Sequence, residues 1–458
     1  MTPHPAPALP EPGRPASDPH FPSLHRVHPR GWINDPNGIH CHDGRWHVYF
    51  QHNPRSTVHE QIEWGHMSSH DLVTWREEPA GPRPRPGEAD RGGCWSGVGL
   101  VVDGVPTLVY SGVDGVDDQL SRVILQRGDA QETRWTPVPG TVADVPEEPG
   151  LFGLRDPFLL ELDGRRFAVQ GAGLARPDGT HVPAILGWDA TDLEDWRYLG
   201  PVLTGEHPVA AEHAPAQLWE CPQLVPVDGR WVLMLSLWSL AEGPGAGRDT
   251  DAVTFLHGDL ALQDGRLAFT PAGGGVVDHG PDFYAPQAVR DGDRTLLWGW
   301  SWEGGGLDSE QAAAQAAAQG WAGALTLPRA LHLRGDVLVS SVPEELRALR
   351  AGEVPVPGDG AGLDLPAPAR AEARAAAGLR LERVRADGTA ETLLGPVEGD
   401  ATLLADAGIL ELLPADAPAS TLRVRVEDGE HLRVHGEDLQ VWELAVPSAD
   451  RERRSMLA

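Results

Sequence analysis

The sequence predicts an all-β protein, a five-bladed β-propeller followed by a smaller C-terminal β-sandwich. Segments rich in β-branched and aromatic residues recur roughly every 60 residues, and most follow an Asp-Gly or similar turn that favours a hairpin. Four-stranded propeller blades repeat at ~40 to 50 residues, and longer loops would stretch that period. The five segments are RWHVYF (45–50), GVPTLVYSGV (104–113), RRFAVQGAG (165–173), RWVLMLSLW (230–238) and RTLLWGWSW (294–302).

The segments around these strands predict the domain organisation. Residues 1–24 are rich in Pro and Ala, which predicts a disordered or loosely docked tail before a propeller at 25–342. Within the propeller, the Ala- and Gln-rich stretch 309–323 predicts a short helix or an ordered insertion. Residues 343–357 are expected to be a linker. At 358–458 strand-like runs alternate with turns, which predicts a second, sandwich-like β domain.

The chain is acidic and contains no lysine. Its 458 residues carry a formal charge of −30, and every fixed cationic side chain is arginine. Such an excess of negative charge repels phosphate backbones, so we expect no nucleic-acid partner. The lack of lysine excludes Schiff-base chemistry and a P-loop lysine. No run approaches the ~18 to 20 apolar residues that cross a bilayer, and the N-terminus does not read as a secretory signal; we expect no membrane partner.

Cysteine and histidine usage predicts neither disulfides nor a metal. Cys41, Cys94 and Cys221 are few and odd in number, which fits a reducing compartment, and we expect a cytoplasmic protein. Cys41 and Cys94 are expected to be buried small apolar residues. His66 and His70 lie four residues apart in HMSSH, but their context is a strand and turn without the HExxH signature of a helical zinc site. We therefore expect no metal and no cofactor.

Three acidic residues lie in apolar, strand-like surroundings: Asp35 in WINDPNG, Asp156 in FGLRDPFLL and Glu220 in QLWECPQLV. A proline directly after an acid favours extended backbone for that acid. Sequence separations of 121 (156 − 35) and 64 (220 − 156) place the three on different blades. Residues at the ends of inner strands would converge on the central channel, so we expect these carboxylates to meet.

Converging carboxylates are what glycoside hydrolysis with retention requires. One carboxylate must be ionised to attack, and another must be protonated to release the leaving oxygen. Trp219 and Cys221 would limit the hydration of Glu220 and favour its neutral form, and Arg155 would hold Asp156 ionised and help to orient a polyol. A single Asp-Pro is more often only a turn or a strand end. The residues alone therefore predict a β-propeller and leave a glycosidase as one interpretation.

Longer blocks of sequence resemble a known family. HRVHPRGWINDPNGIHCHDGRWHVYFQHNP (25–54) resembles the opening block of glycoside hydrolase family 32, the invertases, levanases, inulinases and related β-fructofuranosidases. The likeness continues, in the family's order and to about residue 350, through EWGHMSSHDLVTW, GCWSGVG, FGLRDPF, LWECPQL, DHGPDFYAPQ, LLWGWSW and GWAGALTLPRAL. The C-terminal part matches weakly and, at roughly 110 residues, is short beside the family's usual β-sandwich.

The resemblance implies a retaining glycoside hydrolase that removes terminal β-D-fructofuranosyl units from sucrose or short fructo-oligosaccharides. Asp35 would be the nucleophile, Glu220 the acid/base, and Asp156 the residue that stabilises the transition state through fructose hydroxyls. The partner is then a small-molecule sugar, and no metal or organic cofactor takes part. On this interpretation the Asn-Pro-Asn-Gly frame aims Asp35 and does more than turn the chain.

The resemblance also implies a shell of substrate-binding residues. Asn34 and Gln51 would bind fructose hydroxyls, and Tyr284 would lie near the nucleophile. Trp64, Trp95 and Ser96 would form the pocket wall. The remaining members of the shell would be Arg155, Cys221 and either Trp300 or Trp302. Trp300 and Trp302 both fit by position the tryptophan that closes the site, and the choice stays open. Glu303 is a candidate contact to the leaving sugar.

Four alternatives remain at this stage. The same acids would serve a transfructosylase, in which a sugar resolves the intermediate, or a sucrose-6-phosphate hydrolase. The chain could instead be an inactive fructan-binding module, although Asp35, Asp156 and Glu220 are all present. A related five-bladed propeller acting on arabinan or xylan fits less well, because the WINDPNG and WECP blocks favour fructose. The leaving group and the oligomeric state stay open.

Overall fold

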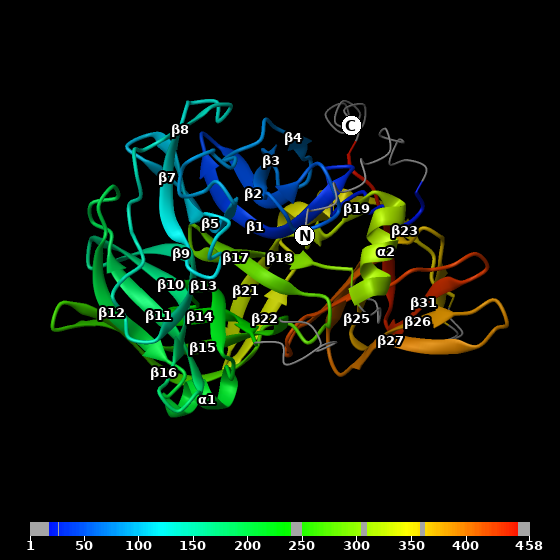
Figure 1. The fold of residues 1–458 in the computed structure, drawn as a ribbon. Coiled ribbons are helices and arrows are strands. Elements are labelled where there is room, and N and C mark those ends of the chain that lie inside the picture. The colour runs from blue at the N-terminus through cyan, green and yellow to red at the C-terminus, as the bar shows by residue number, and fades with distance from the viewer. Residues whose placement is uncertain (1–17, 26, 240–249, 304–308, 358–361, 448–458) are drawn as a thin grey trace.

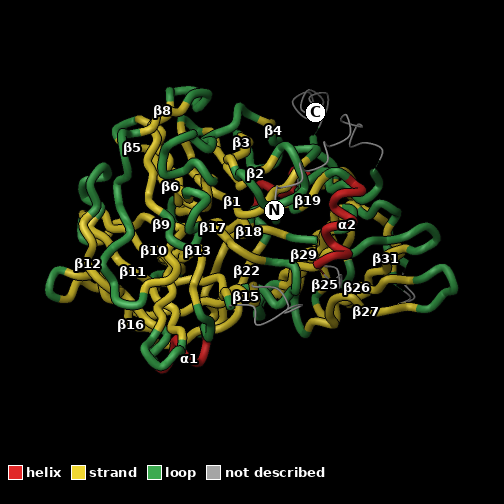
Figure 2. The backbone as a smooth tube through the Cα atoms, in the orientation of Figure 1, coloured by secondary structure: helices red, strands yellow, loops and turns green. Residues whose placement is uncertain are grey.

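The computed structural model describes residues 18–25, 27–239, 250–303, 309–357 and 362–447. Strands dominate these ranges, and Figure 2 shows them throughout the molecule. The helical elements described are α1 (Pro208–His213), α2 (Ser309–Gln319) and the 3-10 helix η2 (Glu344–Leu349). The all-β class is thus confirmed, and so is the helix predicted within 309–323. No helix in the described ranges has the length and apolar character needed to cross a membrane.

Five sheets of mainly antiparallel strands follow one another in the described residues from 31 to 341. Their strands are, sheet by sheet, β1 (Gly31–His42), β2 (Arg45–Asn53), β3 (Glu63–Ser69) and β4 (Arg76–Glu77); β5 (Gly93–Val102), β6 (Val105–Val113), β7 (Arg122–Gly128) and β8 (Trp135–Pro137); β9 (Leu151–Leu162), β10 (Arg165–Ala175), β11 (His181–Asp189) and β12 (Arg197–Thr204); β13 (Leu218–Val227), β14 (Arg230–Trp238), β15 (Thr250–Gln263) and β16 (Arg266–Val276); β17 (Tyr284–Asp291), β18 (Arg294–Ser301), β21 (Arg329–Arg334) and β22 (Val337–Ser341).

Each of these sheets begins with a hairpin, and its second strand is one of the five predicted segments: β2, β6, β10, β14 and β18. Four of the hairpins turn through Asp-Gly pairs in which both residues have positive φ, as at Asp43 (49°) and Gly44 (73°). Two-residue hairpin turns need this conformation, which glycine adopts freely and aspartate tolerates. Local turn chemistry therefore fixes where each strand pair begins.

The first strands of the five sheets lie next to one another around a ring. β1 contacts β5, β5 contacts β9, β9 contacts β13, β13 contacts β17, and β17 contacts β1. Two short strands close this ring, because β19 (Trp321–Ala322) pairs in parallel with β1 while β20 (Ala324–Leu325) pairs with β18 of the last sheet. Figure 1 shows the sheets following one another from blue to yellow. Residues far apart in sequence thus meet at the centre.

The C-terminal strands form two further sheets beside the ring (Figure 1). The six-stranded sheet contains β23 (Arg350–Val354), β25 (Arg370–Ala375), β28 (Ala401–Asp406), β29 (Ile409–Pro414), β30 (Ser420–Arg423) and β32 (Gln440–Leu444), and the four-stranded sheet contains β24 (Leu363–Leu365), β26 (Ala377–Val384), β27 (Ala390–Val397) and β31 (His431–Glu437). Buried apolar residues of both sheets form one core cluster. The predicted linker 343–357 contains η2 and β23, and β23 pairs with β32, so that part is sheet and not linker.

Buried polar contacts join the ring to the C-terminal sheets. The Arg329 guanidinium on β21 donates to Asp278 Oδ2 and to Glu411 Oε2 on β29, both at 2.7 Å. His25 lies 2.7 Å from Glu411 Oε1 and 3.0 Å from Asp406 Oδ2, and the backbone N–H of Leu24 donates to Asp406 at 2.6 Å. Residues 18–24 are therefore docked, whereas the rest of the predicted tail, 1–17, lies outside the described residues.

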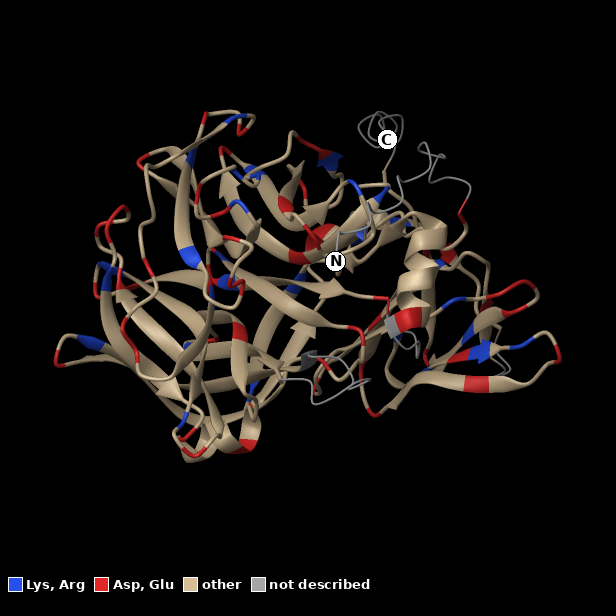
Figure 3. Cartoon of the chain, in the orientation of Figure 1, with Lys and Arg blue, Asp and Glu red and all other residues tan. Residues whose placement is uncertain are grey.

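Many acidic residues lie on the turns and outer loops, where Figure 3 colours the ribbon red. Examples are the hairpin turn at Asp43, which is exposed, and the turn at Asp178, whose carboxylate binds the backbone of its own loop. These exposed carboxylates are part of the net charge of −30. A large net charge mainly keeps a protein soluble and makes copies of it repel one another.

Candidate active site

A β-bulge interrupts the first strand of every ring sheet. In each strand two residues oppose one on the hairpin partner, which bends the strand and redirects side chains. The bulged pairs are Asn34-Asp35, Trp95-Ser96, Asp156-Pro157, Cys221-Pro222 and Ala285-Pro286. Two of the predicted acids thus sit in bulges, and Glu220 directly precedes one.

The bulges also explain the prolines of these strands. Asp156, Cys221 and Ala285 have φ of 59°, 46° and 44°, each followed by proline. Proline cannot donate to a sheet ladder and is tolerated at bulges, where the ladder is already broken. The extended geometry expected for Asp156 is therefore wrong, because its left-handed φ belongs to the bulge.

Asp35 is held by side chains from three strands. Its Oδ1 accepts a hydrogen bond from Asn34 Nδ2 at 3.0 Å, and its Oδ2 accepts from Gln51 Nε2 at 3.0 Å and from the Ser96 hydroxyl. Gln51 also donates to Ser96 Oγ at 2.7 Å. Trp32 donates to Asn34 Oδ1 at 2.8 Å, which fixes the orientation of that amide. The carboxylate therefore has one defined orientation.

Cys221 lies between two of the acids. Its Sγ lies 3.6 Å from Asp35 Oδ2 and 3.5 Å from Asp156 Oδ2, and its backbone N–H donates to Asp156 Oδ2 at 2.9 Å. The backbone N–H of Asp156 in turn donates to Ser111 Oγ at 2.7 Å. Asp35, Asp156 and Cys221 are all more than 90% buried. The structure thus brings together two acids that lie 121 residues apart.

Glu220 joins the cluster from β13. Its Oε2 lies 2.8 Å from the Tyr284 hydroxyl, and its Oε1 lies 3.6 Å from Arg155 Nε. Arg155 donates to Gln119 Oε1 at 2.6 Å, and its guanidinium lies 5.7 Å from the centre of the Trp95 ring. The guanidinium is thus directed at Glu220 and Gln119, although Arg155 precedes Asp156 in sequence.

Both buried aspartates resist ionisation. Burial raises the pKa of Asp35 to about 6, the charge of Glu220 adds to this rise, and the hydrogen bonds from Ser96, Asn34 and Cys221 oppose it. Burial likewise raises the pKa of Asp156 to about 6, although Arg155 acts against the rise. The expectation that Arg155 holds Asp156 ionised is therefore wrong, because burial raises the pKa of Asp156 more than the Arg155 guanidinium lowers it.

The tryptophans predicted at the site occupy different positions. Trp95 is half-buried, whereas Trp64 is 0% exposed, packs among Tyr49 and Tyr110, and donates to the Trp95 carbonyl at 3.1 Å. Trp64 is therefore buried behind Trp95 and does not reach the surface that was predicted for it.

The two candidate closing tryptophans are both close to the site. Trp302 stacks on Tyr284 with ring centres 5.4 Å apart and donates to Pro281 O at 2.8 Å. Trp300 contacts Trp32 edge-on at 5.6 Å. Glu303, a candidate sugar contact, accepts the Gly323 N–H at 2.7 Å and contacts Arg423 at 3.2 Å, so its carboxylate is already bonded to protein.

Sequence reasoning missed several residues around the acids. His59 is exposed, lies 3.0 Å from Gln51 Oε1, and contacts the edges of Trp32 and Trp95. Ser111 and Gln119, described above, were also missed. Their segments carry no catalytic motif, and only the bonding partner of each reveals its role.

Two predictions about cysteine and histidine have definite outcomes. Cys94 is buried as expected, but Cys41, next to the end of β1 at the hairpin turn, is exposed. His66 and His70 do not converge: His66 is buried on β3, while His70 lies near Arg45 and the Gly44 carbonyl.

The comparisons with known proteins agree with this geometry. A model described as "Glycosyl hydrolases family 32 N-terminal domain" matches residues 25–341, so the chain is one of the glycosyl hydrolases. Within that class it belongs to family 32, which confirms the resemblance seen in the sequence.

Individual relatives show how far the similarity extends. A sucrose-6-phosphate hydrolase from Klebsiella pneumoniae is 33% identical over 349 residues, covering 73% of this chain and 69% of the relative. A raffinose invertase from Escherichia coli is 31% identical over 346 residues, covering 72% and 66%. The match thus spans about two thirds of each curated relative.

Solved structures share the fold across almost the whole chain. The Bombyx mori GH32 beta-fructofuranosidase BmSUC1 has a TM-score of 0.74 at 22% identity, covering 94% of this chain and 95% of its own. A sucrose-6-phosphate hydrolase from Lactobacillus gasseri also has a TM-score of 0.74, at 20% identity, covering 94% of both chains. The C-terminal sheets are therefore part of the shared architecture.

Proposed function

We propose that the protein is a β-fructofuranosidase that cleaves terminal β-D-fructofuranosyl units with retention of configuration. One observation carries this proposal: Asp35, Asp156 and Glu220, from the first strands of three different sheets, meet around Cys221. A buried group of carboxylates in unequal surroundings suits double-displacement chemistry on a glycoside.

In the proposed reaction, Asp35 is the nucleophile and Glu220 is the acid/base. Glu220 donates its proton to the glycosidic oxygen while Asp35 attacks the anomeric carbon, so the bond to the leaving sugar breaks as the fructosyl ester forms. Glu220, now ionised, removes a proton from water, and the resulting attack releases fructose and restores Asp35. Asp156 binds fructose hydroxyls and stabilises the transition state.

The shell around Asp35 supports these roles. Asn34, Gln51 and Ser96 fix the nucleophile's oxygens, and each retains hydrogen-bonding capacity for a sugar hydroxyl. Arg155 faces Glu220 and favours the ionised form that acts as base in the second step.

We also propose that the five ring sheets are the blades of a five-bladed propeller and that the two C-terminal sheets form a sandwich. The propeller domain would extend over 25–342, and the sandwich domain would begin with β23 and not at residue 358, because β23 pairs with β32. Three free cysteines support the cytoplasm as the proposed location.

As substrates we propose sucrose or short fructo-oligosaccharides, so the leaving group is glucose for sucrose and the shortened saccharide for a fructo-oligosaccharide. The second candidate is sucrose 6-phosphate, because the Klebsiella pneumoniae relative, at 33% identity, is named a sucrose-6-phosphate hydrolase. Rates on sucrose, sucrose 6-phosphate, raffinose and inulin, measured with one enzyme preparation, decide between them. A kcat/KM for the phosphorylated sugar that exceeds the value for sucrose would favour the second candidate.

The central experiment compares wild type with Asp35→Asn and Glu220→Gln on the preferred sugar. Loss of either group is expected to lower kcat by at least about 10³-fold, with the circular dichroism spectrum unchanged. Reaction in aqueous methanol should give methyl β-fructofuranoside, the product of retention. Full activity in purified Asp35→Asn, or an α-fructoside product, would refute the mechanism.

A further inference from the structure

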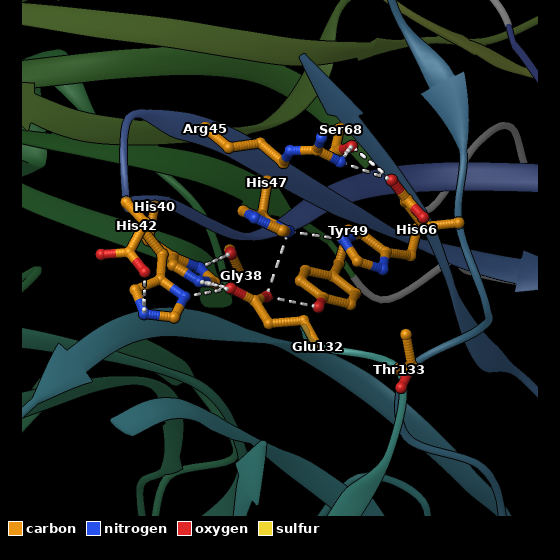
Figure 4. Close-up of polar contacts among 12 residues, drawn as sticks. Gly38, His40, His42, Arg45, His47, Tyr49, His66, Ser68, Glu132 and Thr133 are labelled. Atoms are coloured by element: carbon orange, nitrogen blue, oxygen red, sulfur yellow. Dashed lines mark hydrogen bonds and ion pairs between the residues drawn. The ribbon is translucent and has the colours of Figure 1, made fainter. Parts of the chain in front are cut away.

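Four histidines surround one glutamate where the first ring sheet meets the second (Figure 4). His40 and His42 lie on β1, His47 on β2 and His66 on β3, while Glu132 comes from the loop between β7 and β8. Each of the five is at most 9% exposed. The cluster shares no residue with the carboxylate site, and the proposed reaction gives it no role.

The two oxygens of the Glu132 carboxylate have different partners. Oε1 lies 3.1 Å from His40 Nε2 and 3.2 Å from His42 Nδ1. Oε2 lies 3.2 Å from His47 Nδ1 and accepts the hydroxyl of Tyr49 at 2.8 Å. His40 and His42 thus hold one oxygen, which turns the other toward His47.

His66 directs the lone pair of its Nε2 atom toward His47 Nδ1. Its Nε2 lies 2.9 Å from His47 Nδ1, while its Nδ1 lies 3.2 Å from the Pro79 carbonyl. A carbonyl only accepts, so the neutral ring carries its proton on Nδ1 and Nε2 is bare. Metal-binding histidines characteristically donate their second N–H to a carbonyl or carboxylate in this way. Tyr49 stacks on the His66 ring at 4.0 Å and fixes its plane.

We propose that His47 Nδ1, His66 Nε2 and Glu132 Oε2 form a binding site for a divalent late first-row metal ion, of which Zn²⁺ is the reference. One ligand atom from each of these residues lies within 4.8 Å of the others. Tetrahedral zinc ligands at ~2.0 to 2.1 Å stand about 3.3 Å apart, close to the 2.9 and 3.2 Å found here. Imidazole nitrogens with one carboxylate oxygen suit this class of ion.

The chemistry of the three donors suits a cation. His47 Nδ1 faces two acceptors, the bare Nε2 of His66 and the Glu132 carboxylate, so without a metal ion it carries the proton that they share. A metal ion bound between the three donors would take the place of that proton.

The position of the site indicates a structural role. Its histidines belong to the sheet that carries Asp35, and Glu132 belongs to the loop of the next sheet. A bound ion would fasten the two sheets to each other. Sequence reasoning expected no metal because no HExxH helix is present, whereas this site would draw its ligands from two strands and a loop.

The test is the metal content of the full-length protein. Wild type, Glu132→Gln and His70→Gln are expressed in zinc-supplemented medium, dialysed against metal-free buffer and analysed by mass spectrometry for bound metal. About one equivalent is expected in wild type and in His70→Gln, a matched control outside the cluster, and less than about a tenth in Glu132→Gln. Metal-free wild type, or equal metal in wild type and Glu132→Gln, would overturn the proposal.

A second measurement uses wild type alone, so it does not depend on the folding of a variant. The protein is unfolded in guanidinium and refolded with Co²⁺ or with a chelator. The cobalt sample should show the visible absorption of a tetrahedral site with nitrogen and oxygen ligands, and should melt at least about 3 °C above the chelator sample. Identical melting temperatures without cobalt absorption would contradict the site.

Discussion

The hydroxyl of Tyr284 lies 2.8 Å from Glu220 Oε2 and also 2.8 Å from the carbonyl oxygen of Leu237. The hydroxyl has one proton, and the carbonyl can only accept. If Tyr284 donates to Leu237, its oxygen accepts from a protonated Glu220, and all three groups are satisfied. If Glu220 is ionised, two acceptors compete for one proton. The Tyr284 contact on Oε2 therefore favours the protonated form of Glu220 that the first step needs, whereas Arg155, on Oε1, favours the ionised form.

Tyr284→Phe should remove this preference. We expect kcat to fall by about 10- to 100-fold, and the alkaline limb of the pH–rate profile to move to lower pH, because protonated Glu220 loses its acceptor. KM should change much less. Steady-state kinetics from pH 4 to pH 9 measure both effects, and a profile that only scales down without moving would contradict this role.

Asp35→Asn should inactivate the enzyme and yet stabilise it near neutral pH. Burial raises the pKa of Asp35 to about 6 from its ordinary 3.8, so the folded state binds the proton more tightly than the unfolded state, and ionised Asp35 destabilises the fold above pH 6. We expect the variant to melt about 1 to 3 °C higher than wild type at pH 8.

The higher melting temperature of Asp35→Asn should disappear at pH 4, where Asp35 is neutral in the folded protein. Thermal unfolding at both pH values provides the comparison, with the exposed Asp43→Asn as a control that should not differ. A lower melting temperature for Asp35→Asn at pH 8 would show that its hydrogen bonds outweigh the cost of burying the charge.

Cys221 should influence the pH at which kcat/KM falls on the acid side of the pH–rate profile. Its thiol lies within 3.6 Å of both aspartate carboxylates, and its hydrogen bonds lower the pKa of each against the effect of burial. Cys221→Ala removes that donor, so the acid limb of kcat/KM should move up by about half a pH unit, whereas Cys221→Ser, a stronger donor, should move it down.

The exposed Cys41→Ser is the control for loss of a thiol and should leave the profile unchanged. Shifts of the same sign for Cys221→Ala and Cys221→Ser would show that the thiol acts through packing and not as a hydrogen-bond donor.

Local signals account for what the sequence predicted. The second strand of each ring sheet follows an Asp-Gly or related turn, and both features are encoded within about a dozen residues. The bulges at Asp35 and Asp156 are different, because a bulge exists only relative to the partner strand. Likewise the sequence predicts a linker at β23, since the partner strand β32 lies some 90 residues further on. The burial of Trp64 and the cluster around Glu132 also depend on contacts between separate sheets.

His25 should make stability depend on pH in the alkaline range. Burial lowers its pKa, but the carboxylates of Asp406 and Glu411 outweigh burial and raise it to about 9. Because the pKa of His25 in the folded protein lies above its ordinary value of 6.5, protonated His25 stabilises the fold. This contribution to stability is complete below about pH 6.5 and is lost as the pH rises through 9. A shift of this size corresponds to about 3 kcal/mol, so wild type should melt at a lower temperature at pH 9.5 than at pH 7.

His25→Gln isolates this contribution, because the glutamine cannot be charged. At pH 6.5 the variant leaves Asp406 and Glu411 without a cationic partner at that position, although Arg329 still contacts Glu411 and the backbone of Leu24 still donates to Asp406. The difference in melting temperature between wild type and His25→Gln should therefore be largest at pH 6.5 and small at pH 9.5, while exposed His70→Gln should follow wild type throughout. A difference that stays constant between these pH values would mean that His25 acts by packing alone, and that the N-terminal segment docks on the C-terminal sheets without help from charge.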